Sequence, residues 1–576
     1  MRVQSQPSEK QKSLSKAISK ILLPLVVLVP SFFWIAQSDP FNAPKLLILG
    51  TGAAALGVLS FVNFSKSHLK SHLIVISFSG LFVLALLNSF LFSGAPISAQ
   101  IFGVYGRNTG LLNYLFLVSI LISTTFLVTK NEIKRVFFSI FWVAAFNFFL
   151  CTLEILGVNP QRVDRTYSLD LVGSFGNPNF VSAFMAIFGT VSFIVFLGSD
   201  KRRPVNFLFL VATFAALLTI LRSHSNQGLV ILSAGIFLGF LFKVHFSIQK
   251  RLVRFSFYFT GVFLSIIGVA GVLNMGPLAK YLFENSVKFR WEYWKAGIQM
   301  FLNQPFHGVG LNSYGDWYRS TRSPNSLVTP GVETVTNAAH NVFIDFAATG
   351  GIPLIAAYLA IVILGVRAFI KILKNSGSFD FLPIGLFVGW ICYLVQAAIS
   401  IDQIGLGIYG WVLPGLLIAL SKLPKIQEDE VIPSKRKLEK KSQKGEKELI
   451  SAKDMLATVA GLAIGFTLVF PAIRSDVNWL TALKSADAET LKRAAMQWPR
   501  NENLVASFAK MLLNNKLYSE SVEIAQSGVR EFPRSFIAWQ QIYDNPQAPR
   551  KVRQDALAKM IELDPLNPKL KLLTVP

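Results

Sequence analysis

Two stretches of the sequence carry the polar residues best suited to chemistry. The first, "FRWEYWKAGIQMFLNQPFHGVGLNSYGDWY", contains Arg290, and the second, "NAAHNVFIDFAATGGIP", contains His340, Asn341 and Asp345. His340 and Asp345 are five residues apart, which places them approximately on one face of a helix, so the carboxylate can orient the imidazole. Such a histidine can act as a general base or bind phosphate. A solvated histidine without a catalytic role fits the same residues when they are taken alone.

A second group consists of basic residues beside apolar segments. Lys45 lies in "DPFNAPKLLIL", Arg107 in "FGVYGRNTG" and Arg222 in "LRSHSNQG", while Arg162 and Arg165 share "NPQRVDRTYS". The guanidinium group presents five donors in one plane, which suits phosphate oxygens. These residues predict contacts with a lipid-linked diphosphate at a membrane surface. Single basic residues that only reach lipid headgroups are the alternative.

The third stretch, "GSFGNPNFVSAFMAI", contains Asn177 and Asn179 on either side of a proline. Side-chain amides at the mouth of a membrane span offer polar contacts to a sugar. An Asn-Pro pair also marks a turn and the start of a helix, so a helix cap explains the same residues.

Other kinds of reaction lack their usual residues. The sequence has no glycine-rich phosphate loop and no dinucleotide fingerprint, and its six His and two Cys show no metal-ligand spacing. It also has no Asp-x-Asp-like acidic site of the kind used with nucleotide sugars on the predicted outer face. We therefore predict no metal and no other cofactor.

The elements that position these residues are apolar and long. Of the 576 residues, 52% are apolar and only 15% charged, and mean hydropathy is +0.48. Runs of about 20 apolar residues span a bilayer as helices. The sequence predicts an all-α, polytopic membrane protein with twelve to thirteen transmembrane helices. We place them at 21–37, 44–64, 73–93, 111–128, 135–156, 179–198, 205–221, 228–247, 255–273, 351–373, 381–400, 406–420 and 455–472.

The distribution of basic residues predicts the orientation. The formal net charge is +24, a surplus that by itself fits nucleic acid, anionic lipid or an acidic substrate. With the N-terminus in the cytoplasm, twenty Lys and Arg fall on inner segments and five on short outer ones. This asymmetry follows the positive-inside rule. Thirteen crossings then place the C-terminal tail outside, and most of the surplus implies no acidic partner.

The predicted domains follow from these spans. A cytoplasmic segment, 1–20, precedes the membrane domain 21–420, whose long outer loop is 274–339. A charged cytoplasmic loop, 421–454, leads to the last span, 455–472. The loop holds ten basic and seven acidic residues and fits contact with anionic headgroups. It is tethered between two spans, so we predict no nucleic-acid partner.

The tail, 473–576, is charged and punctuated by proline. Pro499 and Pro533 are 34 residues apart, and Pro565 follows 32 residues later. A 34-residue period that closes on proline is typical of tetratricopeptide repeats. The tail is therefore predicted to be a small helical, tetratricopeptide-like domain, which either binds a protein partner or only caps the membrane domain.

Taken together, the motifs resemble the O-antigen ligase and polymerase superfamily. The likeness rests on "GSFGNPNF", on an Arg with a Trp shortly after it, on Pro-x-x-Gly-x-Gly, and on the terminal His-Asn. It covers roughly residues 20–420. It implies a C-type glycosyltransferase architecture in the bacterial plasma (inner) membrane. Such enzymes transfer a glycan from a polyprenyl diphosphate to an acceptor on the outer face, without a nucleotide or an essential metal.

The resemblance also implies roles for individual residues. Arg290 is similar to the family's loop arginine, which would stabilise the diphosphate leaving group. His340 is similar to its essential histidine, which would deprotonate the acceptor hydroxyl or hold phosphate. Lys45 and Arg107 lie in segments similar to its outer basic positions. The sequence departs from the family at Asn226, where an Arg is expected, and we hypothesise that Arg222, about one helical turn earlier, replaces it.

The resemblance leaves the acceptor open. Ligation to a lipid core, polymerisation and transfer to protein differ only in the acceptor. A lipid-glycan flippase is a different class, but it should show internal repeats and basic residues at the membrane midplane. Here the basic residues gather at the outer mouths of the spans. A non-catalytic scaffold that recruits partners through the tail is the third class.

Overall fold

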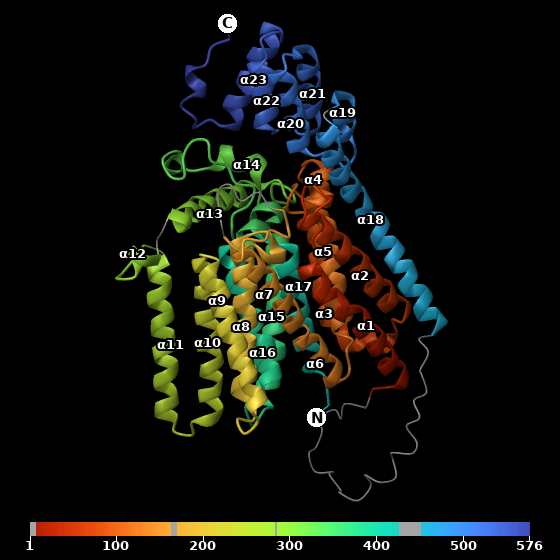
Figure 1. The fold of residues 1–576 in the computed structure, drawn as a ribbon, viewed down its shortest axis with the longest axis vertical. Helices are drawn as coiled ribbons and strands as arrows, with labels where there is room; N and C mark the ends of the chain where they lie inside the picture. The colour runs from red at the N-terminus through yellow and green to blue at the C-terminus, as the bar shows by residue number, and fades with distance from the viewer. Residues whose placement is uncertain are drawn as a thin grey trace, which may run out of the picture.

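The computed structural model describes residues 7–162, 170–272, 274–282, 285–424, 451–485 and 487–575. Regular structure in these ranges is helical throughout, which confirms the predicted all-α class. Long helices run side by side through the lower two thirds of the molecule, and a group of short helices lies above them (Figure 1). Most of the charged segment 421–454, as well as Arg165, falls outside the described residues.

Eleven helices in the described ranges are long and apolar enough to cross a membrane, and two shorter apolar helices accompany them. The chain is therefore an integral membrane protein. All thirteen predicted segments correspond to helices. The long ones are α1 (Glu9–Ser31), α2 (Asn42–Val62), α3 (Lys66–Phe92), α6 and α7 (Lys130–Phe138 and Ile140–Ile155), α8 (Pro178–Gly198), α9 (Leu208–Arg222), α10 (Asn226–Ser247), α11 (Arg251–Val272), α15 (Val342–Lys374), α16 (Phe381–Ile399) and α18 (Ala452–Ser485). The shorter ones are α5 (Leu111–Thr124) and α17 (Ile404–Leu420).

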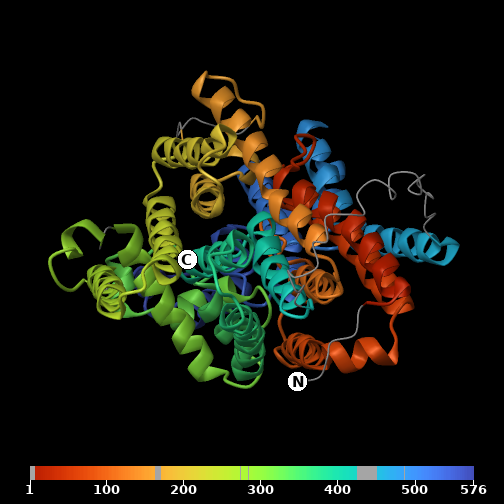
Figure 2. The ribbon, with the colours of Figure 1, turned by 90° about the horizontal axis from the view of Figure 1, so that it is seen from below.

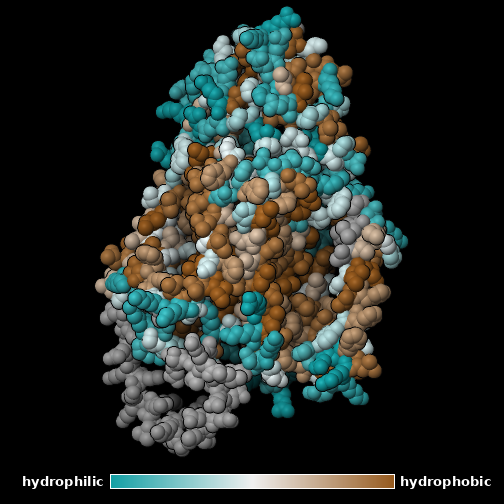
Figure 3. Space-filling view, turned by 180° about the vertical axis from the view of Figure 1, so that it is seen from behind, coloured by the Kyte–Doolittle hydropathy of each residue, from teal (hydrophilic) through white to brown (hydrophobic). Residues whose placement is uncertain are grey.

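The surface agrees with this assignment. On the face that Figure 3 shows, a broad hydrophobic region covers the middle of the molecule, between more hydrophilic upper and lower ends. On α11, for example, Phe255 and Phe259 are about two thirds exposed. Helices suit this environment because hydrocarbon offers no hydrogen-bond partner and a helix satisfies its own backbone groups. Seen from below, α11 and α18 lie at opposite edges of the helical layer (Figure 2).

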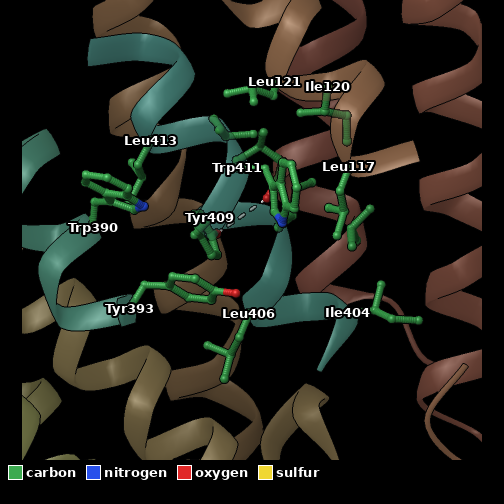
Figure 4. Packing of buried hydrophobic residues seen from close by; sticks show 14 of the residues in the cluster. Leu117, Ile120, Leu121, Trp390, Tyr393, Ile404, Leu406, Tyr409, Trp411 and Leu413 are labelled. Atoms are coloured by element: carbon green, nitrogen blue, oxygen red, sulfur yellow. Dashed lines mark hydrogen bonds between the residues drawn. The ribbon is translucent and has the colours of Figure 1, made fainter. Parts of the chain in front are cut away.

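The core of the membrane domain forms where α5, α16 and α17 meet. Trp390, Tyr393, Tyr409 and Trp411 pack there among leucine and isoleucine side chains (Figure 4). The Trp390 indole donates to the Gly410 carbonyl at 3.2 Å. A buried ring with a satisfied polar atom fixes neighbouring helices against each other. This packing supports the N-terminal ends of α5 and α17, next to which the candidate site lies.

Several helix boundaries differ from the prediction, such as that of α15, which begins at Val342 rather than at 351. Two of the differences have a clear local cause. The first helix starts at Glu9 rather than near residue 21, because Ser8 and Gln11 form a capping box that begins the helix in the polar segment. The last span does not end at 472. Helix α18 continues to Ser485, and its Trp479 and Ala482 enter the core of the tail. The last span and the first helix of the tail are thus one continuous helix (Figure 1).

Much of the outer loop is helical. It contains α12 (Ala279–Leu282), α13 (Asn285–Asn303) and α14 (Tyr314–Thr321). The tail follows with α19 (Ala488–Met496), α20 (Glu502–Asn514), α21 (Tyr518–Glu531), α22 (Phe536–Asp544) and α23 (Arg550–Leu563). Consecutive tail helices pack against each other around Phe508 and Ile542. The tail lies over α13 and α14, at the end of the molecule opposite the start of α1 (Figure 1). Its tetratricopeptide assignment stays a prediction.

Candidate functional site

The two glycine motifs of the sequence meet and form the base of the site. Gly308 and Gly351 both have left-handed backbones, with φ of 68° and 67°. A Cβ on Gly351 would lie 2.4 Å from the Pro305 carbonyl oxygen, and one on Gly308 would lie 2.2 Å from the Thr349 carbonyl carbon. Only glycine fits at both positions. The close approach allows the Ile352 amide to donate to the Pro305 carbonyl at 2.7 Å, across a kink in α15.

This joint sets α13 beside the beginning of α15. Tyr293, Tyr314 and Tyr318 fill the space between α13, α14 and α15, and the Tyr314 hydroxyl donates to the Tyr293 carbonyl at 2.5 Å. The Tyr293 ring also packs against the His340 ring, with centroids 5.4 Å apart. Arg290, one turn before Tyr293, and His340, just before α15, are thereby brought to the same region.

The backbone around His340 presents its side chain from a turn rather than from a helix. His340 has φ of 56°, and Asn341 is the N-cap of α15, with its side-chain oxygen accepting from the Phe343 and Ile344 amides. The Asp345 carboxylate accepts from the Ala339 amide at 2.6 Å. The prediction that Asp345 orients the imidazole was wrong, because His340 lies before the helix and the Asp345 carboxylate is engaged by the backbone. Even within a helix, residues five apart lie about 140° apart around the axis. Asp345 instead fixes the backbone that carries His340.

The imidazole itself is unengaged. Neither ring nitrogen forms a hydrogen bond within the described ranges. Burial, followed by the positive charges of Arg107 and Arg290, lowers the pKa of His340 to about 3. The ring is therefore neutral at physiological pH and has a nitrogen free to accept a proton.

The two arginines make the region strongly positive. Burial lowers the pKa of Arg290, which makes no hydrogen bond or ion pair with any described residue. Arg107 donates to the Asn337 carbonyl at 3.4 Å, and burial lowers its pKa to about 10, so it remains charged at neutral pH. Neither guanidinium group forms an ion pair with a described residue, although the charge of Asp345 acts on Arg107. Guanidinium groups of this kind favour an anionic ligand.

A cavity of about 380 Å³ opens beside His340 and Arg107. One wall belongs to the outer loops of the membrane domain and the other to the tail. The membrane-domain wall includes Arg107, Asn312, Asp316, Arg319, Asn337 and His340, and the tail wall includes Glu502, Asn503, Arg534, Phe536, Ile537 and Leu563. The cavity is large enough for a ligand of several sugar or phosphate groups. Arg290 is not among its lining residues, although its charge reaches His340.

Residues 181–359 match the family model described as O-antigen ligase. This part of the chain belongs to the O-antigen ligase family. The matched region runs from α8 into α15, so it contains Arg290, the glycine joint and His340. No curated protein matches the chain.

Beside the O-antigen ligase domain lie two site residues that the sequence analysis missed. A small cavity of about 40 Å³ shares Arg107 and Asn312 with the larger one and is also lined by Tyr114 and Asp402. The Tyr114 hydroxyl donates to Asp402 at 3.1 Å, and burial raises the pKa of the Asp402 carboxyl group. An acidic residue between two apolar runs, in "SIDQIG", was the available signal.

Lys45 is not part of the site. Its side chain is fully buried, and its ammonium group donates to the carbonyls of Phe32, Phe41 and Ser174 at 2.8, 3.3 and 2.6 Å. An ammonium group has three protons, so none remains for a phosphate. The prediction of Lys45 as a diphosphate ligand was wrong. The residue instead joins α2 to the C-terminal end of α1 through Phe32 and to the turn before α8 through Ser174.

The remaining predicted residues lie around the start of α8. Asn177 is the N-cap of α8, and its side chain accepts from the Asn179 amide at 2.9 Å. The Asn179 side chain accepts from the Ser225 hydroxyl at 2.8 Å, which joins α8 to the turn between α9 and α10. Both asparagines are thus engaged within the fold. Arg222 ends α9 and is exposed, and neither it nor Arg162 lines the His340 cavity.

Proposed function

We propose that the protein transfers a glycan from a polyprenyl diphosphate carrier to an acceptor hydroxyl. The O-antigen ligase domain indicates a membrane glycosyltransferase of this general type. The observation that carries the proposal is a neutral, unengaged imidazole placed next to Arg290 of this domain and to Arg107, which precedes the domain in the sequence. One group can accept a proton while the other two stabilise a phosphate, which are the two requirements of the transfer.

The proposed reaction is a displacement at the anomeric carbon. The acceptor oxygen forms the new bond to this carbon while the bond to the phosphate oxygen breaks and its electron pair stays on the diphosphate. Arg290 and Arg107 stabilise the charge that develops there, and a His340 ring nitrogen takes the proton of the acceptor hydroxyl. Preorganised donors of this kind typically contribute a factor of about 10²–10³ in rate.

The carrier's hydrocarbon chain needs an apolar site. A cavity of about 840 Å³ lies between α10, α11 and α16 and is lined almost entirely by apolar side chains, among them Phe237, Leu238, Val262 and Ile266. It extends to Met275, at the end of α11 from which the chain leads to α12 and α13. We propose that the polyprenyl chain lies there and its diphosphate reaches toward Arg290.

We further propose that the site faces outward from the bacterial inner membrane. The support is the charge asymmetry of the loops, together with the position of the tail at the end of the molecule opposite the start of α1 (Figure 1). Residues of the tail line the same cavity as His340. The acceptor is a lipid core, a growing polymer or a protein. The tail's use by a protein partner stays a prediction.

The test is transfer by the purified full chain. The protein is incubated with a polyprenyl-diphosphate oligosaccharide and candidate acceptors, and free polyprenyl diphosphate is measured. We expect release by wild type and a loss of about 10²-fold or more in His340→Ala and Arg290→Ala. His307→Ala is the matched control, because His307 lies in the same outer region and outside the His340 cavity.

Each result is informative. Equal release by wild type and the two variants would contradict the site. If the protein in vesicles moves the lipid-linked glycan across the bilayer without releasing the carrier, it is a flippase and the proposed function is wrong. Full activity of Arg222→Ala would contradict the idea that Arg222 replaces the family's arginine at Asn226.

A further inference from the structure

Buried ion pairs and hydrogen bonds join the tail to the outer loop. Asp564, at the end of α23, is fully buried and accepts from Arg322 at 2.7 and 2.9 Å and from Arg319 at 2.9 Å. On the neighbouring side, Arg534 donates to the Ser320 hydroxyl at 2.9 Å and stacks over the Trp317 ring at 3.6 Å. Charged pairs with this degree of burial hold two surfaces in one fixed arrangement.

This attachment places the first residues of two tail helices at the His340 cavity. Glu502 and Asn503 open α20, while Phe536 and Ile537 open α22, and all four line the cavity. Ile537 is 45% exposed there. The Asn503 side-chain amide forms no hydrogen bond within the described part of the chain. An exposed isoleucine and an unused amide on the wall of a cavity are groups available to a ligand.

The opposite wall adds carboxyl groups. Asp316 on α14 faces the same cavity as Glu502. Burial raises the pKa of both carboxyl groups, and the charge of Glu502 adds to the effect on Asp316. Carboxyl oxygens accept hydrogen bonds from hydroxyl groups in either protonation state, and a protonated carboxyl group also donates one. Together with the amide of Asn503 and the apolar surface of Ile537, they match the alternating hydroxyls and C–H faces of a sugar.

We propose that the tail completes the binding site for the saccharide part of the acceptor. Its sugar units lie between α14 and the beginnings of α20 and α22, and its reacting hydroxyl reaches His340. This inference rests on the proposed transfer reaction. The donor is anchored by its lipid and must approach from the spans, whereas the tail wall lies beyond the outer loops. We therefore assign the end of the cavity next to the tail to the acceptor.

Two exposed tail residues provide the test, each with a matched control. Asn503→Ala and Ile537→Ala remove cavity-lining groups, whereas Asn514→Ala and Ile561→Ala change exposed tail residues that do not line the cavity. The probe is a mixture of oligosaccharides released from the surface polysaccharide of the native cells. Its affinity for the purified full chain is measured by calorimetry, and KM for acceptor and for donor is measured by transfer.

We expect a roughly 3- to 10-fold weaker affinity and higher acceptor KM in each cavity variant, as the loss of one hydrogen bond or apolar contact predicts. Donor KM and both controls should be unchanged. Unchanged affinity in both cavity variants would overturn the inference while leaving transfer intact. A rise in donor KM instead would assign the tail wall to the donor glycan and also overturn it. Binding that depends on Asn503 and Ile537 in a protein that transfers nothing would support this subsite and refute the proposed function.

Discussion

The ion pairs at Asp564 lead to a quantitative prediction for the tail. Asp564 and Arg322 are both fully buried, and Arg319 beside them is only 13% exposed. Asp564→Asn keeps the shape of the side chain but leaves the buried Arg322 guanidinium without a counter-charge. Breaking one partner of a buried pair typically costs about 3–5 kcal/mol, because the remaining charge stays desolvated. We expect the free energy that holds the tail against α14 to fall by about this amount in Asp564→Asn.

Hydrogen–deuterium exchange of the full chain measures this cost directly. Amides of α14 should exchange roughly 10²- to 10³-fold faster in Asp564→Asn, since about 1.4 kcal/mol corresponds to a factor of ten. The matched control is Lys569→Ala. Lys569 also joins the tail to the outer loop, through Glu333 at 2.7 Å, but both side chains are about two thirds exposed.

An exposed pair contributes at most about 1 kcal/mol, so Lys569→Ala should change the exchange of α14 by less than about tenfold. Similar exchange in the two variants would refute the reasoning, because burial would then have no effect on the strength of the attachment. Asp564→Asn should also raise KM for the acceptor, since the cavity wall formed by α20 and α22 depends on the attachment.

Three further predictions concern the fold and the site. Gly351→Ala should destabilise the protein by about 1–3 kcal/mol and reduce transfer. Gly377 has open space around it, so Gly377→Ala should change neither stability nor transfer. Thermal unfolding measures the stability of the two variants, and the release assay measures their transfer. Lys45→Met should lower the unfolding temperature by removing donors to three carbonyls and should leave KM for the donor unchanged. An unchanged unfolding temperature with a raised donor KM would instead indicate that Lys45 binds the diphosphate. Because the pKa of free His340 is about 3, kcat/KM for the donor should show no acid limb near pH 6.5. For the same reason, stability should fall as pH drops from about 6.5 toward 3, and His340→Gln should reduce that fall.

Hydropathy located every apolar helix because the bilayer imposes a length and a composition on each segment. It missed the boundaries where local signals override composition. The capping box at Ser8 starts the first helix early, and the helix through Trp479 continues because its apolar residues enter a second core. Motif spacing similarly drew attention to the Pro-x-x-Gly-x-Gly stretch that contains Gly308, but not to its packing against the backbone around Gly351.

The site was only partly predictable, because burial and long-range contacts are not local properties of a sequence. Lys45 is a basic residue at the start of an apolar segment, as a lysine that binds phosphate at the membrane surface would be. In the structure, however, its ammonium group donates to three backbone carbonyls. Asp402 and Tyr114 are separated by 288 residues, and Arg534 and Asp316 by 218. No periodicity or motif relates such pairs. The role of the tail as a wall of the cavity could therefore not be predicted from sequence.

The charges around His340 suggest how the proposed reaction depends on the donor. A base with a pKa of about 3 holds a proton poorly, and the second and third causes of that low value, after burial, are Arg107 and Arg290. A bound diphosphate would bring negative charge to those same arginines and so oppose their effect on the imidazole, which raises its pKa. His340 would then become an effective base only when the donor is in place.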